Sequence, residues 1–238
     1  MTIKKRNRYQ QGLVKLERAL SKLGLASRTE ARVLIKDAKV KVNGRVCKDP
    51  SYLVQPEHAQ IEISDQLQKT QKEIVIIFHK PKGCVTTKRD ENGRKTVYDF
   101  LPEEFHRLHP VGRLDFATSG LLIFTNNTKL SSQLTNPQNQ ILRTYLVTVR
   151  GEVIDKSLKK IHEGIWDKDE LLKAESVSVR KRSARETHLT IQLTEGKNRE
   201  IRRLFLALGH EVIALKRIAF GEFELGELQS GEYKLFSA

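Results

Sequence analysis

The 238-residue chain has only two cysteines and no long hydrophobic run. Cys47 and Cys84 are too few and too isolated for a disulfide framework or a zinc site, so we expect a reducing compartment, the cytoplasm. No apolar stretch approaches the roughly 20 residues that a membrane-spanning helix needs, so no membrane association is expected. The N-terminus is charged but lacks the apolar segment of a secretory signal, and we interpret residues 1–12 as a basic arm.

Signature motifs for nucleotide and redox cofactors are also missing. The sequence contains no G-x-x-x-x-G-K-[ST] phosphate loop, since its Gly196-Lys197 pair is followed by Asn, and no G-x-G-x-x-G or G-x-S-x-G pattern. The histidines are scattered. His106 and His109 are three residues apart, but Pro110 would break a helix there. We therefore predict that the protein uses neither a metal nor a cofactor.

Positive charge is what the sequence has in excess. The formal net charge is +14, and residues 1–60 alone carry 14 lysines and arginines against 5 acidic residues, a local balance of +9. This concentration favours a polyanionic partner over a charged surface that only maintains solubility. Because 38% of the residues are hydrophobic, the chain can also form a packed core.

Residues 13–63 form a predicted small unit of their own. Apolar residues recur at helical spacing over residues 13–23, and Gly24 is a plausible stop. Ser27 and Glu30 then have the spacing of a capping box, which predicts a second helix through Ile35. The alternating segment VKVNGRV contains the Asn43-Gly44 pair that favours a tight hairpin.

Basic residues repeat every four positions along both predicted helices. Arg18 and Lys22 share one face of the first helix, and Arg28, Arg32 and Lys36 share one face of the second. Like charges at this spacing repel each other by about 0.2–0.5 kcal/mol per pair. Their presence is most easily explained if phosphates neutralise them.

The segment VKLERALSKLGLASRTEARVLIKDAKVKVNGRV resembles the alpha-L RNA-binding module of a small-subunit ribosomal protein and of many RNA-modifying enzymes. The resemblance covers about fifty residues, and it implies that the five basic residues of the two helices bind RNA. One departure is Ala38, where that module usually has a glycine. A left-handed residue there costs alanine roughly 1 kcal/mol more than glycine.

A change of pattern follows this unit. Residues 64–72 (SDQLQKTQK) are polar and aperiodic, which predicts a linker. Over residues 73–238, apolar or alternating segments at 74–78, 145–149 and 189–193 predict strands, and 128–134, 154–161 and 198–208 predict helices. The spacing is not the regular alternation of a parallel sheet. We therefore predict an α+β domain with a mixed, mainly antiparallel sheet.

Two segments of this second part carry unusual residue combinations. HKPKGCVTTKRDENGRKTV (79–97) is a basic loop after a strand, which by itself fits an exposed hairpin. VGRLDFATSGLLIFTN (111–126) places Asp115 between Arg113 and a turn before an apolar strand. Taken alone, Asp115 could simply cap that turn through Ser119 and Gly120.

A third segment, EGKNREIRRLFLALGH (195–210), predicts a helix with one apolar face. Arg199, Arg202 and Arg203 lie in its first turns, where each positive charge opposes the helix macrodipole by about 0.3–1 kcal/mol. A helix built only for stability would not cluster arginines there. We expect phosphates or a buried carboxylate to engage them.

Together with RTYLV (143–147), these three segments resemble the ribosomal RNA pseudouridine synthases of the RsuA and RluB-like family, in order and at similar intervals. With the alpha-L module in front, the resemblance covers nearly the whole chain. It implies the pseudouridine synthase fold over residues 73–238 and the isomerisation of one uridine in ribosomal RNA. The segment DENGRKTVYDFLP (90–102) inclines us toward the large subunit.

The resemblance also implies roles for individual residues. Asp115 is the expected catalytic group, acting as a nucleophile or as a base on a flipped-out uridine. Tyr145 is expected to stack beside the target base. Burial alone would raise the pKa of a carboxyl, so a fixed cation must keep Asp115 ionised. Arg202 is the expected cation, Arg113 a weaker candidate that could instead hold the loop, and Arg199 a further substrate-binding residue.

The expected partner is ribosomal RNA, free or within a ribosomal assembly intermediate, and the expected oligomeric state is a monomer. Two other functions are compatible with parts of the sequence: a non-catalytic RNA-binding assembly factor, and an RNA methyltransferase carrying the same N-terminal module, although the latter needs a glycine-rich cofactor loop that is missing. The basic residues expected to flank the pocket and contact RNA are Lys80, Lys82, Lys88, Arg89, Arg94 and Arg107.

Overall fold

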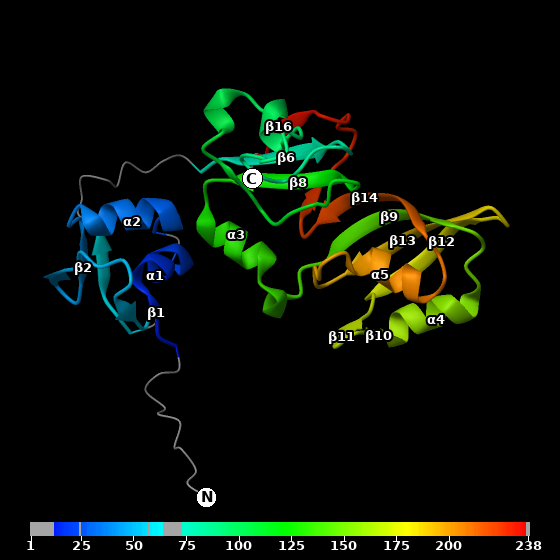
Figure 1. Ribbon diagram of the computed structural model, residues 1–238, viewed down its shortest axis with the longest axis horizontal. Helices are drawn as coiled ribbons and strands as arrows, with labels where there is room; N and C mark the ends of the chain where they lie inside the picture. The colour runs from blue at the N-terminus through cyan, green and yellow to red at the C-terminus, as the bar shows by residue number, and fades with distance from the viewer. Residues whose placement is uncertain (1–11, 24, 57, 64–72, 237–238) are drawn as a thin grey trace, which may run out of the picture. The chain divides into compact units, whose positions relative to one another are not determined.

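The computed structural model describes all residues except 1–11, 24, 57, 64–72 and 237–238 (Figure 1). The predicted linker and nearly all of the predicted N-terminal arm therefore lie outside the described residues. The chain divides into two compact units, Met1–Glu73 with Asn127–Ser132, and Ile74–Asn126 with Gln133–Ala238. In the described part of the chain, no helix has the length and apolar character needed to cross a membrane.

Two short helices form one layer of the first unit. They are α1 (Leu16–Lys22) and α2 (Arg28–Lys36), close to the predicted bounds. The predicted capping box is confirmed: the Glu30 N–H donates to Ser27 Oγ at 3.3 Å, and the Ser27 N–H donates to the Glu30 carboxylate at 2.9 Å. These bonds satisfy two N–H groups that the first turn leaves without intrahelical partners.

The strands of this unit form two small sheets. Asn43 and Gly44 both have positive φ, 48° and 77°, as the predicted tight turn requires. Ala38 adopts φ 59°, so the alanine does occupy a left-handed position. Side chains of both helices pack on β2 to form the unit's core. The strands are β1 (Val14–Lys15) with β4 (Leu53–Val54), and β2 (Val40–Val42) between β3 (Arg45–Val46) and β5 (Ile61–Ile63).

A nine-stranded sheet organises the second unit (Figure 1). Its order is β12-β13-β9-β14-β8-β6-β16, with β7 beside β8 and β15 beside β14. Within it β14 and β8 are parallel, and the other described pairs are antiparallel, which confirms the predicted fold class. The strands are β6 (Val75–Lys80), β7 (His109–Pro110), β8 (Ser119–Thr125), β9 (Arg143–Arg150), β12 (Ser176–Arg182), β13 (Glu186–Leu193), β14 (Val212–Phe220), β15 (Phe223–Glu224) and β16 (Tyr233–Leu235).

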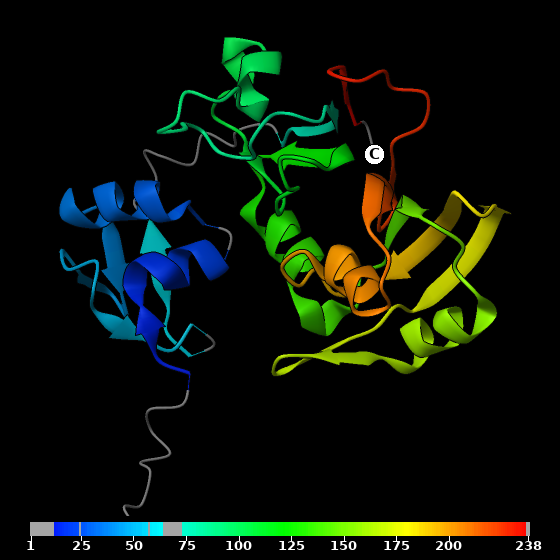
Figure 2. The same ribbon diagram turned by 45° about the vertical axis from the view of Figure 1, so that its right-hand side comes forward.

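Each half of this sheet has its own core. Alternating residues of β9 and β13 pack against two helices, α4 (Asp155–Glu163) and α5 (Glu200–Ala207), which Figure 2 shows on the same face. The strands β6 and β8 instead pack against short 3-10 turns, η3 (Val97–Phe100) and η4 (Glu103–Phe105). The remaining elements are α3 (Thr128–Thr135), η5 (Pro137–Asn139) and the hairpin β10 (Ile165–Asp167) with β11 (Glu170–Leu172).

The two halves meet at the parallel contact of β8 with β14, where Gly120 lies opposite Arg217. Gly120 has φ +109°, and a Cβ atom there would lie 2.1 Å from the Arg217 carbonyl oxygen. Only glycine therefore permits this approach. The loop that carries Asp115 enters β8 directly before this junction.

Candidate active site

Asp115 lies in the loop of residues 111–118, between β7 and β8. The turn is closed by its backbone, because the Thr118 N–H donates to the Asp115 carbonyl oxygen at 3.0 Å. Among the described residues, no hydrogen bond or ion pair involves the Asp115 carboxylate. The half-buried side chain is therefore not used as a turn cap and is available to a ligand.

Lys80, at the end of β6, holds this turn in place through hydrogen bonds to its backbone. Its side chain is fully buried, and its Nζ donates to the carbonyl oxygens of Pro81 (3.0 Å), Asp115 (3.2 Å) and Thr118 (3.0 Å). Burial lowers the pKa of Lys80, while the nearby Cys84 and Asp115 act in the opposite direction. The expectation that Lys80 contacts RNA is wrong, because the side chain has no exposed surface and all three of its donors are used.

Further hydrogen bonds fasten the same loop on both sides of Asp115. Thr86 Oγ1 donates to the Leu114 carbonyl oxygen at 2.9 Å and accepts from the Leu114 N–H at 3.3 Å. The Gly83 N–H donates to the Phe116 carbonyl oxygen at 2.9 Å. The segment that follows β6 thus holds the backbone at the residues before and after Asp115. A carboxylate on such a backbone is positioned before substrate binds.

Arg202, on α5, holds the far side of the loop. Its guanidinium donates to the Ala117 carbonyl oxygen at 3.3 Å and to the Val212 carbonyl oxygen at 2.9 Å. Burial lowers the pKa of Arg202, the positive charge of Arg199 acts in the same direction, and the negative charge of Asp115 opposes them. Arg202 is thus within electrostatic range of Asp115, but its hydrogen bonds go to the backbone carbonyls of Ala117 and Val212 rather than to the carboxylate.

A pocket of about 410 Å³ opens beside Asp115. Of the predicted catalytic and substrate-binding residues, Arg113, Asp115, Tyr145 and Arg199 line it, and Arg202 does not. Tyr145 comes from β9 and keeps 8% of its surface exposed, whereas Arg113 and Arg199 are exposed. Four residues from three segments that are far apart in the sequence therefore meet in one cavity of the second unit.

Two residues of the pocket floor, Arg217 and Phe220, were not predicted from the sequence. Arg217 is 3% exposed, and its Nε donates to the Leu121 carbonyl oxygen at 2.8 Å. Its guanidinium lies 4.9 Å from the Phe220 ring centroid, and that of Arg143 lies 4.5 Å away. Charged residues inside the alternating segments RTYLV and LKRIAF were the available signal, since a cation is rarely placed on a core face without a specific partner.

Arg143 is the second buried cation of this floor. Its guanidinium donates to the carbonyl oxygens of Ile141 (2.8 Å), Thr194 (2.7 Å) and Leu134 (3.1 Å). Burial lowers the pKa of Arg143, and the neighbouring charge of Arg217 contributes in the same direction. Arg143 thus ties the start of β9 to the segments around it.

The start of α5 shows what its clustered charges contact. Arg203 forms ion pairs with Asp167 and Glu170 of the β10–β11 hairpin, the latter at 2.6 Å, so carboxylates rather than phosphates engage this arginine. Arg199 precedes the helix in a left-handed conformation, with φ 50°. Glu200 is 4% exposed and accepts from the Lys197 N–H at 3.0 Å, and burial raises its pKa.

The residues predicted to bind RNA through the first unit all lie at its surface. Arg18, Lys22, Arg28, Arg32 and Lys36 are exposed. Arg32 differs from the others because it forms an ion pair with Glu17. The guanidinium of Arg32 lowers the pKa of Glu17. Lys82, in the second unit, is exposed as well.

The described part of the chain contains no group of three or more His, Cys, Asp or Glu side chains that could hold a metal ion. Nε2 of His106, one of the pair that the sequence singled out, lies 3.0 Å from the carbonyl oxygens of both Tyr98 and Leu101.

Comparison with protein families agrees with this fold. Residues 74–207 match the model of the RNA pseudouridylate synthase family, and residues 14–59 match that of the S4 domain. The chain therefore belongs to the RNA pseudouridylate synthases, a family of isomerases, and carries an N-terminal S4 RNA-binding domain. The S4 match falls on the segment that resembles the alpha-L module.

Individual relatives extend over most of the chain. A ribosomal large subunit pseudouridine synthase B of Bacillus subtilis (strain 168) is 37% identical over 92% of this chain and 90% of its own length. An RNA pseudouridine synthase of Aquifex aeolicus (strain VF5), itself uncharacterized, is 36% identical over 93% and 89%. A crystal structure of a pseudouridylate synthase matches with a TM-score of 0.67 at 28% identity, covering 94% of this chain and 96% of that one.

Proposed function

We propose that the protein converts one uridine of ribosomal RNA, in the large subunit, to pseudouridine, and that Asp115 is the catalytic residue. The family membership and the relatives named for large-subunit ribosomal RNA support the substrate. One observation supports the role of Asp115 most directly. Its carboxylate has no hydrogen bond or ion pair among the described residues, although its backbone is fastened by Lys80 and Asp115 lines the pocket.

The reaction moves the ribose from nitrogen to carbon of the same base. The N1–C1′ bond breaks, the uracil turns, the C5–C1′ bond forms, and the proton on C5 leaves while N1 gains one. No atom is added or lost overall, so no cofactor is required. Asp115 serves this sequence either as a nucleophile toward the sugar or as a base, and both roles need an ionised carboxylate.

The pocket provides the other requirements of the reaction. A uridine must leave its stack at a cost of a few kcal/mol, roughly 2–4. Stacking on Tyr145 returns about 1–3 kcal/mol of that cost. The exposed guanidinium groups of Arg113 and Arg199 lie in the pocket lining, where they can contact phosphates that flank the target.

The first unit supplies binding energy through residues that do not line the pocket. The exposed cations of α1 and α2 contact phosphates of a folded stem or loop, which positions the RNA without reading its sequence. The substrate is free ribosomal RNA or an assembly intermediate, and the protein acts as a monomer.

Tritium release from uridine labelled at carbon 5 tests this proposal, because the C5 hydrogen leaves only if the glycosidic bond moves to carbon. Ribosomal RNA fragments and ribosomal particles are incubated at a fixed salt concentration with the protein, with Asp115→Asn, and with Asp169→Asn. The first substitution removes the charge but keeps the shape. The second is a matched control at an exposed aspartate outside the pocket lining.

We expect release with the unchanged protein and with Asp169→Asn, and none with Asp115→Asn although it still binds RNA. Equal release by all three proteins would remove Asp115 from the mechanism. Tight binding without release from any fragment or particle would favour a non-catalytic assembly factor.

A further inference from the structure

The side chain next to Asp115 in the sequence is a large exposed aromatic. Phe116 keeps 46% of its surface exposed, although its backbone carbonyl is held by Gly83. Asp115 lines the pocket and Phe116 does not. The ring therefore lies outside the cavity that would take the target base, directly beside the residue that would act on it.

A guanidinium already faces this ring. Arg94 Cζ lies 6.0 Å from the Phe116 ring centroid, within the range of a cation–π contact. Arg94 is oriented by a bidentate ion pair with Asp90, in which Nε donates to Oδ2 at 3.0 Å and Nη2 donates to Oδ1 at 2.6 Å. Asp90 also accepts from the Arg94 backbone N–H at 2.9 Å. The pairing lowers the pKa of Asp90 to about 2, so this arrangement persists at neutral pH.

The segment that carries Arg94 is fastened to the loop of Asp115. Its two ends are joined where the Val85 N–H donates to the Lys95 carbonyl oxygen at 2.9 Å and the Val97 N–H donates to the Val85 carbonyl oxygen at 3.0 Å. Thr86 connects this closed end to Leu114. Phe116 and Arg94 are thus held on one preformed framework, which lowers the ordering cost of a ligand that binds between or upon them.

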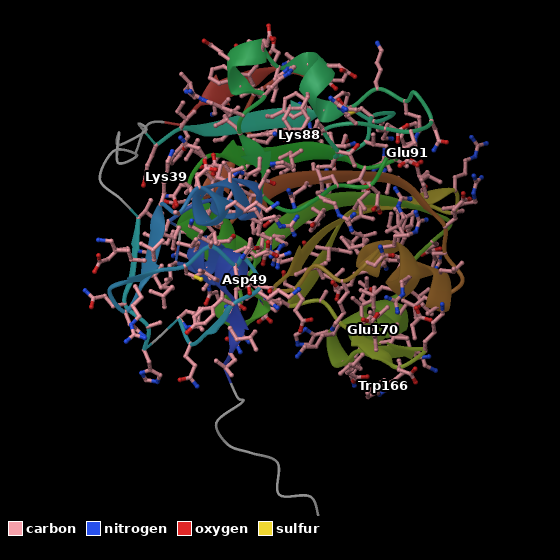
Figure 3. All side chains as sticks on the ribbon, turned by 60° about the vertical axis from the view of Figure 1, so that its left-hand side comes forward. Lys39, Asp49, Lys88, Glu91, Trp166 and Glu170 are labelled. Atoms are coloured by element: carbon pink, nitrogen blue, oxygen red, sulfur yellow. The ribbon has the colours of Figure 1, made fainter. Side chains whose placement is uncertain are left out.

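The surroundings of this pair are positively charged. Lys88, Arg89 and Lys95 are exposed on the same segment, and Asp90 is already occupied by Arg94. Lys88 and Glu91 are labelled on this segment in Figure 3. An exposed aromatic ring, a planar guanidinium and exposed cations together match the chemistry of an unpaired nucleobase with its phosphate.

We propose that Phe116 and Arg94 form a stacking site for one unpaired nucleobase that flanks the target uridine. The inference rests on the proposed function for the identity of the target, but the stacking itself requires only that RNA is bound. The site positions RNA and takes no part in the chemistry.

Abasic substitution tests this site. The RNA is the ribosomal fragment that releases most tritium or, if none does, the fragment that binds most tightly, with single abasic nucleotides placed at each position around the target or binding region. Dissociation constants are measured at one salt concentration in an Asp115→Asn background, so that the RNA stays unreacted. The compared variants are Phe116→Leu, Phe116→Tyr and Arg94→Lys, each checked for an unchanged thermal unfolding midpoint.

We expect Phe116→Leu to weaken RNA binding roughly tenfold. Phe116→Tyr should keep the dissociation constant of the protein with Phe116, because stacking needs an aromatic plane rather than apolar bulk. Arg94→Lys keeps the charge but loses the plane, and a severalfold weakening is expected. In the protein that keeps Phe116, one abasic position should weaken binding by about the same factor as Phe116→Leu does. In Phe116→Leu, that abasic position should have no further effect.

Equal abasic penalties in both proteins at every position, or full affinity of Phe116→Leu, would overturn the stacking site while leaving the synthase proposal intact. Loss of the abasic penalty in Phe116→Leu without tritium release from any RNA would support the stacking site even though the synthase proposal had failed.

Discussion

In the S4 unit the basic side chains of α1 and α2 are exposed, whereas around the pocket Lys80, Arg143 and Arg217 are buried and donate to backbone carbonyl oxygens. Lysine and arginine therefore serve two different purposes: exposed side chains are available to RNA, and buried ones hold the backbone. Exposed cations can exchange counterions for phosphates, so their contribution depends on salt. Buried cations are shielded from salt and determine where loops lie. A count of positive charges cannot separate the two groups.

Stability should be most sensitive to substitution at the contact of β8 with β14, where Gly120 lies opposite the buried Arg217. Gly120→Ala places a Cβ atom against the backbone of Arg217 at a positive φ, so we expect the free energy of unfolding to fall by about 4 kcal/mol or more. Urea unfolding measures this. Gly209→Ala is the control, since Gly209 has a similar φ of +82° but open space around it, and it should lose only about 1 kcal/mol. Equal losses would mean that β8 and β14 can separate freely.

Lys80→Met compares a buried cation with an exposed one in the same HKPKG motif. The substitution removes three hydrogen bonds, from Nζ to the carbonyl oxygens of Pro81, Asp115 and Thr118, so we expect a loss of about 3 kcal/mol of stability. Tritium release should also fall at all salt concentrations, because the Asp115 turn loses its anchor. Lys82→Met, at the exposed lysine, should unfold like the unchanged protein. A stable, fully active Lys80→Met would show that the other hydrogen bonds suffice to hold the turn.

The smallest effect is expected in the S4 unit, on RNA affinity rather than on folding. Arg28→Ala and Lys36→Ala should each reduce the slope of log affinity against log salt by about 1, with unfolding changed by less than about 0.5 kcal/mol. Arg32→Ala should change the slope less, because Arg32 is already paired with Glu17. Filter binding of a ribosomal RNA fragment over a salt series measures the three slopes. An Arg32 effect as large as the others would mean that the ion pair opens when RNA binds.

Local patterns were sufficient to predict the S4 unit. The capping box at Ser27 and Glu30 and the turn at Asn43-Gly44 were correct because their hydrogen bonds and backbone angles involve residues at most three apart. The helices α3, α4 and α5 were also placed within a few residues, since apolar periodicity is a local signal.

The partners of the charged residues could not be predicted in the same way. Lys80 looks like the other lysines of a basic loop, and its burial depends on β8 and β6 pairing with Lys80 opposite Gly120. Arg203 looks like Arg199 and Arg202, but only Arg203 faces the hairpin that carries Asp167 and Glu170. Such contacts join residues 33 or more positions apart, for which no sequence period exists.

The sequence by itself therefore determined the helices, a few strands of the large sheet, the fold class and the identity of the motif around Asp115, because each follows from neighbouring residues or from the order of motifs. The tertiary structure alone decided which cations face solvent and which hold the Asp115 loop. It also decided that Arg113, Asp115, Tyr145 and Arg199 share a pocket, because the pairing of β14 with β8 and β9 brings those segments together.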